Sequence, residues 1–397
     1  MKKGGKNLII LFVTIAVVML GFGIIIPIIP FLIKRFGGGG LALGQLISIY
    51  SIMQFVFAPI WGVLSERYGR KPILIIGVVG NGLGHLFFAL STELWMLFAA
   101  RALAGVLSSA TLPTAMAYIG DATSDTDRGG GMGMLAAAMS LGMIIGPGLG
   151  GWMANLSLAA PFFLAAGLSA IALVPVVLLL PESLPVASRK QGKIGNIAEQ
   201  FRDMGRALFG PLAFSLSLAF VLDLGLMIFE GVFSLLALER YQYGPSQVGN
   251  VLVMAGIIGV VMQGAMSGPL MKRFGEGMVV KLSLILSAVA FVLMLWPTSS
   301  WGVMLTVGFY VVSNSLLRPA ITAYISKRAP GGQGEAMGLS NSFMGLGRIL
   351  GPILGGFLYD MQWSLPYVCG AAIMLLGFLA SMLWLKEQKS TVASPIK

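Results

Sequence analysis

Long apolar runs alternate with short polar segments along nearly the whole chain. The first run begins at Leu8, after three lysines, and is too long for the hydrophobic region of a signal peptide, so we interpret it as a retained helix. Each run is about 20 residues or longer, which is enough to cross the hydrocarbon layer as a helix. The runs lie at about 8–33, 42–64, 72–91, 94–119, 132–154, 159–181, 211–238, 246–271, 278–297, 301–325, 337–358 and 365–385. The pattern predicts an all-α membrane protein with twelve transmembrane helices.

One long polar segment separates the first six runs from the last six. Residues 182–210 are predicted to be a cytoplasmic linker between an N-terminal six-helix half (1–181) and a C-terminal six-helix half (211–385), with a cytoplasmic tail at 386–397. Apolar linker residues recur at steps of three and four opposite charged ones, which is typical of an amphipathic helix lying on the membrane surface. The apolar positions are Ile194, Ile197, Phe201, Met204 and Leu208, and the charged ones are Arg202, Asp203 and Arg206.

The two halves repeat each other at a nearly constant offset. The matching pairs are 62–69 with 268–275, 113–119 with 319–325, and 146–151 with 351–356, which are 206, 206 and 205 residues apart. Three ordered matches at almost one spacing indicate an internal duplication. The halves therefore carry the same elements in the same order, which is how one class of transporter is assembled around a central cavity.

Composition and charge agree with a membrane location. Hydrophobic residues make up 57% of the chain and charged residues only 10%, which is too little charge to cover a water-soluble protein of 397 residues. Of the 26 lysines and arginines, 20 fall in segments on the side of the N-terminus, and only Lys34, Arg35 and Arg240 lie in the opposite loops. We therefore expect both termini in the cytoplasm, and we attribute the net charge of +11 to topology and not to nucleic acid.

Two carboxylates fall inside the seventh predicted span. Asp223 and Glu230 are seven residues apart, so they lie on one helical face, two turns from each other. Charge at that depth marks a functional candidate, and either residue could take up and release a proton as access alternates. Arg101 and Arg318, also within spans, could favour the proton-free carboxylate, so these four residues are the predicted coupling set. The alternative is a static pair that merely neutralises Arg318 or Arg348.

Substrate contacts are expected from the amides that lie within spans. A permissive binding pocket needs polar amides and flexible apolar groups on the helices that face a cavity. The amides within the predicted spans are Gln54, Gln263, Asn314 and Asn341.

The duplicated stretches are candidate gating elements. Gly62 and Gly69 permit tight turns, and Glu66 lies among basic residues that include Arg70, so the 62–72 loop could form a charge network that holds one face of a two-state transporter shut. The alternative is a topology signal alone. The small residues around Pro147 and Pro352 predict kinkable, closely packed helices, with Gly146-Pro147 and Gly351-Pro352 as the predicted gating pairs.

Three of these stretches resemble the motifs of the major facilitator superfamily. Residues 62–72 resemble its loop signature, with Glu66 where the family usually has aspartate, and residues 97–105 resemble its fourth-helix arginine motif. Residues 142–151 are similar to the fifth-helix motif that marks antiporters within that superfamily. The resemblance extends over essentially the whole chain and implies the major facilitator fold.

Further stretches resemble the multidrug:proton antiporters of Gram-positive bacteria, with tetracycline exporters as near relatives. These are residues 20–30, 229–235 and 318–322. The resemblance implies efflux of lipophilic, often cationic compounds in exchange for protons. Its positions match Gln54, Glu230, Gln263, Asn341 and Phe343, which adds Phe343 to the expected substrate contacts. Two positions depart from the family: Ser315 stands where an aspartate is usual, and Arg348 where the residue is usually uncharged.

The sequence therefore predicts a proton-coupled antiporter that exports drug-like amphiphiles across the cell membrane. One histidine, one cysteine and no nucleotide-binding loop argue against an enzyme, and we expect no cofactor and no metal. The expected partners are the lipid bilayer, small amphiphilic substrates and protons, and we expect a monomer. The alternative on the same fold is an exporter or flippase for a single endogenous lipid, sugar or metabolite. A passive channel is disfavoured by the duplicated halves and the antiporter-type motif.

Overall fold

The structure, a computed structural model, describes residues 3–124, 126–189, 197–329 and 332–385. Within these ranges the chain forms helices and no strand. The first half contains α1 (Lys3–Ile25), α2 (Ile29–Arg35), α3 (Gly40–Tyr68), α4 (Arg70–Ala89), α5 (Leu94–Ser108), α6 (Thr111–Ala122), α7 (Arg128–Met153) and α8 (Ala160–Leu178). After the short 3₁₀ turn η1 (Val186–Ser188) and α9 (Ile197–Ala207) come α10 (Ala213–Tyr241), α11 (Pro245–Val261), the π-helical segment η2 (Met262–Met266), α12 (Ser267–Phe274), α13 (Glu276–Leu293), α14 (Ser300–Ser315), α15 (Leu317–Lys327), α16 (Gln333–Met361) and α17 (Leu365–Trp384).

The predicted all-α membrane fold is confirmed. In the part of the chain that the structure describes, eleven helical segments are long and apolar enough to cross a membrane. The predicted span missing from these eleven is the eleventh in the sequence, α16, which has 29 residues but a lower mean hydropathy because it carries Glu335, Asn341, Arg348 and Asp360. The fourth and tenth spans are each broken once, between α5 and α6 and between α14 and α15, so the internal duplication includes this break.

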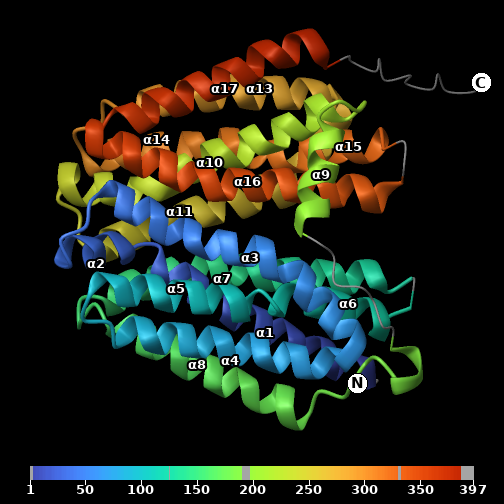
Figure 1. The fold of residues 1–397 in the computed structure, drawn as a ribbon. Helices are drawn as coiled ribbons and strands as arrows, with labels where there is room; N and C mark the ends of the chain where they lie inside the picture. The colour runs from blue at the N-terminus through green and yellow to red at the C-terminus, as the bar shows by residue number, and fades with distance from the viewer. Residues whose placement is uncertain (1–2, 125, 190–196, 330–331, 386–397) are drawn as a thin grey trace, which may run out of the picture.

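The helices form two bundles that lie side by side (Figure 1). Helices α1 to α8 make up one bundle and α10 to α17 the other, and the principal contacts between them are α3 with α16 and α7 with α11. In each half, the helix of the first span packs along the helix of the fifth span: α1 packs on α7, and α10 packs on α16. Both bundles therefore contribute equivalent helices to their common interface.

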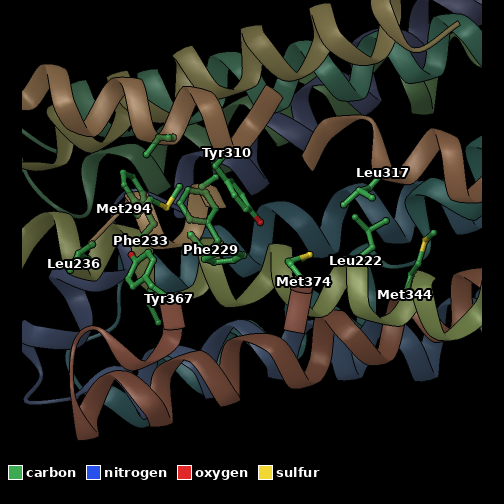
Figure 2. Packing of buried hydrophobic residues seen from close by; sticks show 14 of the residues in the cluster. Leu222, Phe229, Phe233, Leu236, Met294, Tyr310, Leu317, Met344, Tyr367 and Met374 are labelled. Carbon is green, nitrogen blue, oxygen red and sulfur yellow. The ribbon is translucent and has the colours of Figure 1, made fainter. Parts of the chain in front are cut away.

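The larger of two apolar clusters contains buried residues of both bundles. In the second bundle aromatic residues of α10, α13 and α14 pack together, with ring centroids 4.6 Å apart for Phe229 and Tyr310 and 5.0 Å apart for Phe291 and Tyr310 (Figure 2). A separate cluster around Leu11, Tyr118 and Val176 joins α1, α6 and α8 of the first bundle. Because the larger cluster extends across both bundles, a shift of one bundle against the other must repack part of it.

The predicted linker helix forms as α9, but its surroundings differ from the expected membrane surface. The Phe201 ring lies 5.8 Å from that of Phe55 in α3, and the Gln200 amide donates to the Ser342 hydroxyl of α16 at 3.1 Å. Helix α9 therefore touches both bundles at one end of the molecule (Figure 1). Ile194 and the predicted tail at 386–397 lie outside the described residues.

Candidate substrate cavity and coupling site

A cavity of about 1340 Å³ lies between the two bundles. It is lined by α3, α6 and α7 on one side, by α15 and α16 on the other, and by α9 at its mouth. Among the described residues, the wall of the first bundle carries no charged side chain and combines Gln54 and Ser51 with Phe55, Met116 and Met139. Flexible thioethers beside a few amides and hydroxyls give a surface that can adapt to apolar molecules of different shape.

The charged side chains that line the cavity come from α9, α15 and α16. Glu199, Asp203, Arg206 and Glu335 lie near the mouth, whereas Arg318 and Arg348 lie deep inside. Along α16, Arg348 is thirteen residues beyond Glu335, which corresponds to about 20 Å at 1.5 Å per residue. The cavity therefore has mixed charge at its mouth and arginines at its floor.

The floor arginines share one carboxylate. Nη2 of Arg318 donates to Oδ1 of Asp223 at 2.5 Å, and Nε of Arg348 lies 3.5 Å from Oδ2. The Asp223 side chain is completely buried, whereas those of Arg318 and Arg348 are 46% and 36% exposed. An ion pair of Asp223, which the sequence left open as an alternative with Arg318 or Arg348, is therefore present and involves both arginines.

Glu230 lies on the same helix, two turns beyond Asp223, and does not line the cavity. Within the described residues it forms neither a hydrogen bond nor an ion pair, although Asp223 and Arg318 both act on its charge at longer range. The neighbouring Tyr310 hydroxyl is buried without a hydrogen-bond partner. Glu230 is thus a half-buried carboxylate whose proton is not held by a fixed partner.

Arg101 is separate from this cluster. Its guanidinium lies over the rings of Tyr50 at 4.6 Å and Phe22 at 5.4 Å, and it is 3% exposed, with its Nε atom lacking a hydrogen-bond partner. Stacking on two aromatic faces offsets part of the cost of burying this charge. The structure therefore brings Asp223, Arg318 and Arg348 together and leaves Arg101 in the other bundle.

The predicted substrate contacts are distributed unevenly. Gln54 and Asn341 line the cavity from opposite walls, as the sequence predicts. Gln263 is exposed within η2, whereas Asn314 and Phe343 are buried, and none of these three lines the cavity in this structure. The rotation of each helix about its axis decides which face meets the cavity, and the linear pattern of amides does not contain that information.

The end of the molecule opposite α9 is closed by backbone contacts between the bundles. A Cβ atom on Gly40 would lie 2.7 Å from the Gly356 carbonyl oxygen, and one on Gly249 would lie 2.5 Å from the Pro147 carbonyl oxygen. The predicted gating pairs Gly146-Pro147 and Gly351-Pro352 thus lie in α7 and α16, which each contact a helix of the opposite bundle. In addition, the Ser48 hydroxyl donates to the Ile349 carbonyl at 2.6 Å. Small residues allow this approach because a side chain at either glycine would displace the facing helix.

Charged residues at the same closed end were not predicted from the sequence. The backbone N–H groups of Gly40 and Leu41, at the start of α3, donate to the Asp360 carboxylate of α16 at 2.6 and 2.8 Å. Glu239 of α10 accepts a hydrogen bond from the Tyr359 hydroxyl at 2.8 Å and forms an ion pair with Lys34 of α2. We call these residues, Lys34, Glu239, Tyr359 and Asp360, the closed-end clamp. The available signal was a lone carboxylate at the end of a predicted span, which does not reveal that its partner is in the other half.

We expect Asp360→Ala to favour opening of this end. The carboxylate caps a helix of the other bundle, and loss of an N-cap side chain costs about 1 kcal/mol, roughly a fivefold change in the ratio of the two states. Spin labels on Arg35→Cys and Gln362→Cys in a Cys369→Ser background would report the separation by pulsed electron resonance. Glu93→Ala, which removes an exposed carboxylate elsewhere, should leave the distance distribution unchanged. An unchanged distribution in Asp360→Ala would show that the cap does not hold this end closed.

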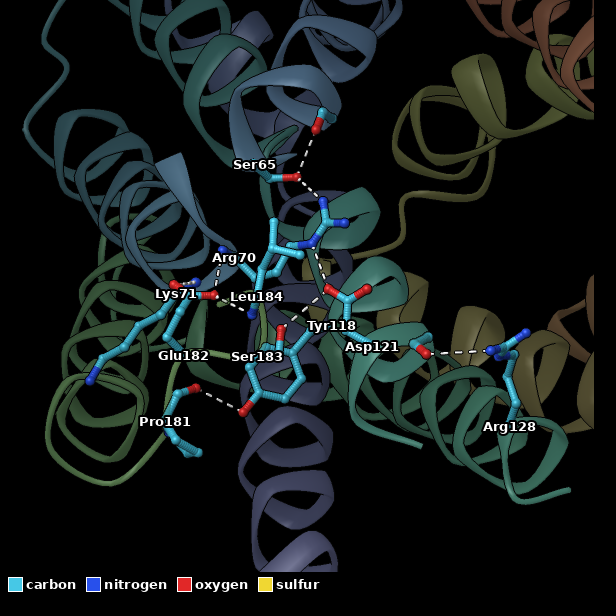
Figure 3. A network of polar contacts seen from close by, with 12 residues as sticks. Ser65, Arg70, Lys71, Tyr118, Asp121, Arg128, Pro181, Glu182, Ser183 and Leu184 are labelled. Atoms are coloured by element: carbon cyan, nitrogen blue, oxygen red, sulfur yellow. Dashed lines mark hydrogen bonds and ion pairs between the residues drawn. The ribbon is translucent and has the colours of Figure 1, made fainter. Parts of the chain in front are cut away.

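The 62–72 loop forms a polar network within the first bundle (Figure 3). The Arg70 side chain donates to Asp121 of α6 at 2.9 Å and to the Ser65 hydroxyl at 2.6 Å. The first two backbone N–H groups of α4, from Arg70 and Lys71, donate to the Glu182 carboxylate at 2.8 and 3.1 Å. The network that the sequence predicts for Glu66 is therefore made by Glu182 and Asp121, and Glu66 has no hydrogen bond or ion pair among the described residues.

Gly69 and Gly62 provide a matched pair of substitutions. Gly69 has φ = 106°, and a Cβ atom there would lie 2.9 Å from the Glu182 carboxylate carbon, whereas a Cβ atom on helical Gly62 would meet nothing within 4 Å. We expect Gly69→Ala to lower the free energy of unfolding by about 1–3 kcal/mol, because it combines backbone strain with displacement of a helix cap. Gly62→Ala should be neutral or slightly stabilising. Thermal unfolding of both variants in mild detergent tests this, and equal melting temperatures would contradict it.

Within the described residues, no group of three or more His, Cys, Asp or Glu side chains is arranged to hold a metal ion. Two helical bundles around a cavity, with ion pairs at its floor and a clamp at its closed end, are the architecture of a membrane transporter. The sequence model of the Major Facilitator Superfamily matches residues 11–311 and 215–397, and the chain belongs to that family.

Several characterised proteins are similar over nearly their full length. Multidrug resistance protein 2 of Bacillus subtilis (strain 168) is 33% identical over 387 residues, covering 97% of this chain and 96% of that protein. Quinolone resistance protein NorA of Staphylococcus aureus is 28% identical, with 94% and 95% covered. Among solved structures, a bacterial homologue of the human lysosomal transporter Spinster matches with a TM-score of 0.78 at 14% identity (98% and 99% covered), and a nucleoside transporter with 0.76 at 18% (98% and 100% covered). The chain is therefore a multi-pass membrane transporter and not an enzyme.

Proposed function

We propose that this protein is a proton-coupled antiporter that exports several drug-like amphiphiles from the cell. The observation that carries the proposal is the cavity itself, with an adaptable apolar wall on one side and, on the other, Arg318 and Arg348 paired with the buried Asp223. The multidrug and quinolone resistance names of its relatives support this substrate range. A transporter for a single ligand would be expected to present a fixed set of polar contacts around most of its cavity.

The proposed transport cycle moves the two halves, residues 1–181 and 211–385, against each other. The excess of basic residues on the side of the N-terminus supports a cytoplasmic location of both termini in the plasma membrane, so that the cavity at α9 opens to the cytoplasm. The closed-end clamp would then hold the outer face shut, and it must break when the substrate is released. We propose that the closely packed helices around Pro147 and Pro352 act as the pivots.

The proposed proton carrier is Glu230. Its partners are not fixed, so its protonation state can change without breaking an ion pair, whereas Asp223 is held by Arg318 and Arg348. We propose that loss or gain of the Glu230 proton changes the electrostatic potential at Arg318, and so changes the strength of the Arg318–Asp223 ion pair. Arg101, in the other half, would contribute by its fixed positive charge. We propose that one molecule is sufficient for transport, because the two halves of one chain supply opposite walls of the cavity.

The proposal is tested by efflux from proteoliposomes. Purified protein is reconstituted into liposomes. The proteoliposomes are loaded with ethidium or a fluoroquinolone, and a proton gradient is imposed across their membrane, with a protonophore as control. Gradient-dependent export of several unrelated compounds is the expected result. An export rate that is unchanged by the protonophore would contradict proton coupling. Transport of one compound only would support a dedicated exporter or flippase.

A further inference from the structure

We propose that the floor of the cavity is an anion-binding subsite, formed by Arg318 and Arg348, that selects amphiphiles carrying a carboxylate or a similar anionic group. This inference rests on the proposed function in so far as the cavity is the substrate cavity. It goes beyond that function because it assigns the charge of the substrate and the two residues that read it. It also runs opposite to the cation preference that the family resemblance implies.

The first argument is the balance of charge at the floor. Two guanidinium groups face one carboxylate, and that carboxylate is fully buried whereas both arginine side chains are partly exposed to the cavity. The described residues of the other half add no charged side chain to the cavity wall. Glu230 does not offset the excess from within the cavity, because it lies about 10 Å further along α10 and does not line the cavity.

The second argument is the number of hydrogen-bond donors that the protein leaves unused. A guanidinium has five N–H donors. Among the described residues Arg318 uses one in a hydrogen bond with Asp223, and Arg348 makes only the longer ion pair at 3.5 Å. Guanidinium donors that face a cavity suit a planar carboxylate, which can accept two parallel hydrogen bonds.

The third argument is the arrangement of charge along the cavity. Glu199, Asp203 and Glu335 lie near the mouth, about 20 Å from the floor as estimated along α16. An amphiphile bound with its anionic group at Arg318 and Arg348 would place its apolar body against the wall that contains Met116 and Met139. A positively charged group on the same molecule would then extend toward the mouth, where these three carboxylates outnumber the one basic residue, Arg206. A zwitterionic amphiphile bound in this orientation places its anionic group near the floor arginines and its cationic group near the carboxylates of the mouth.

The test uses probes that share an apolar body and differ in charge. Pyrenebutyrate, pyrenebutanol and pyrenebutyl-trimethylammonium are titrated by fluorescence into the protein in nanodiscs of neutral lipid. We expect the wild-type protein to bind pyrenebutyrate at least about tenfold more tightly than the ammonium probe, which is about 1.4 kcal/mol. The preference should decrease as the salt concentration rises, because the interaction is between charges.

Arg348→Gln is the decisive variant. It leaves the Arg318–Asp223 pair intact, and we expect it to weaken pyrenebutyrate binding about tenfold while the pyrenebutanol affinity stays unchanged, which also controls for folding. Arg348→Lys should retain most of the preference for the anionic probe. Arg202→Gln removes one positive charge from an exposed position on α9 that does not line the cavity, and it should change neither affinity.

Two results would overturn the subsite. One is a wild-type protein that binds the ammonium probe as tightly as pyrenebutyrate, and the other is an Arg348→Gln variant that weakens all three probes alike. Adding short-chain phosphatidylglycerol identifies the source of the anion: competition with pyrenebutyrate assigns the subsite to a lipid headgroup, and its absence to a free amphiphile. The efflux assay remains separate, because charge-selective binding without gradient-driven export would contradict only the antiport function.

Discussion

Glu230→Gln is expected to abolish efflux driven by a proton gradient while leaving substrate binding measurable. Glutamine has nearly the same shape as glutamate but cannot bind and release a proton, so the cycle loses its coupling step. Because Glu230 has no ion pair among the described residues and does not line the cavity, its replacement leaves the floor arginines and the apolar wall in place. Export under an imposed gradient should fall to the level of protein-free liposomes.

The matched control for this prediction is Glu93→Gln. Glu93 precedes α5 at the surface and accepts a hydrogen bond from the Trp95 indole. The Glu93→Gln variant carries the same chemical change at the surface, and it should export substrate normally. Efflux that is normal in Glu230→Gln would remove Glu230 from the coupling role and leave Asp223 as the next carboxylate to test. Loss of probe binding as well as efflux would show that Glu230 shapes the cavity.

Asp223→Ala is expected to destabilise the protein more than Gly69→Ala or Asp360→Ala. It leaves Arg318 and Arg348 facing each other without the carboxylate they share. Removal of one partner from a fully buried ion pair costs about 3–5 kcal/mol, and because both arginines are partly exposed to the cavity we expect a loss at the lower end of that range. Thermal and detergent-induced unfolding of the purified variant should show this loss. Combining Asp223→Ala with Arg318→Gln should recover part of it, since the double variant buries less uncompensated charge.

An exposed ion pair on α9 provides the comparison for Asp223. Asp203 lies 3.7 Å from Arg206, and the two side chains are 58% and 70% exposed. Asp203→Ala should therefore change stability by no more than about 1 kcal/mol. If Asp223→Ala were equally mild, the floor cluster would have to be well hydrated, and Asp223 would not be a fixed counterion of the two arginines.

Much of the fold was predictable because hydrocarbon imposes simple rules on a sequence. Apolar runs of about 20 residues, the duplication at an offset of 206 and the glycine-proline stretches predict the twelve helices and the equivalence of the halves. Helix α16 is not among the eleven helices that are apolar enough to cross a membrane by composition alone. It carries Arg348 and packs between α3 and α10. Burial among other helices relaxes the demand for an apolar surface, so its polar residues are tolerated.

The candidate site was only partly predictable. Gln54 and Asn341 were placed on the cavity wall from their residue type, and Asp223 was recognised as a costly buried charge. Its two arginine partners, however, lie 95 and 125 residues away along the chain, and the sequence left both a proton carrier and a static pair open for the same carboxylate. Glu66 was expected in a network that the structure builds from Glu182 instead.

The sequence by itself determined the class of molecule: helices that cross a membrane, in two equivalent halves, with a few charges that must find partners. Only the tertiary structure decided which charges meet, because the pairing depends on the rotation of each helix about its axis and on contacts between distant segments. That packing joins Asp223 to two arginines, places Asp360 on the start of α3 and leaves Glu230 unpaired among the described residues. Hydrophobicity is a local property of the chain, whereas an ion pair is a property of two positions in space.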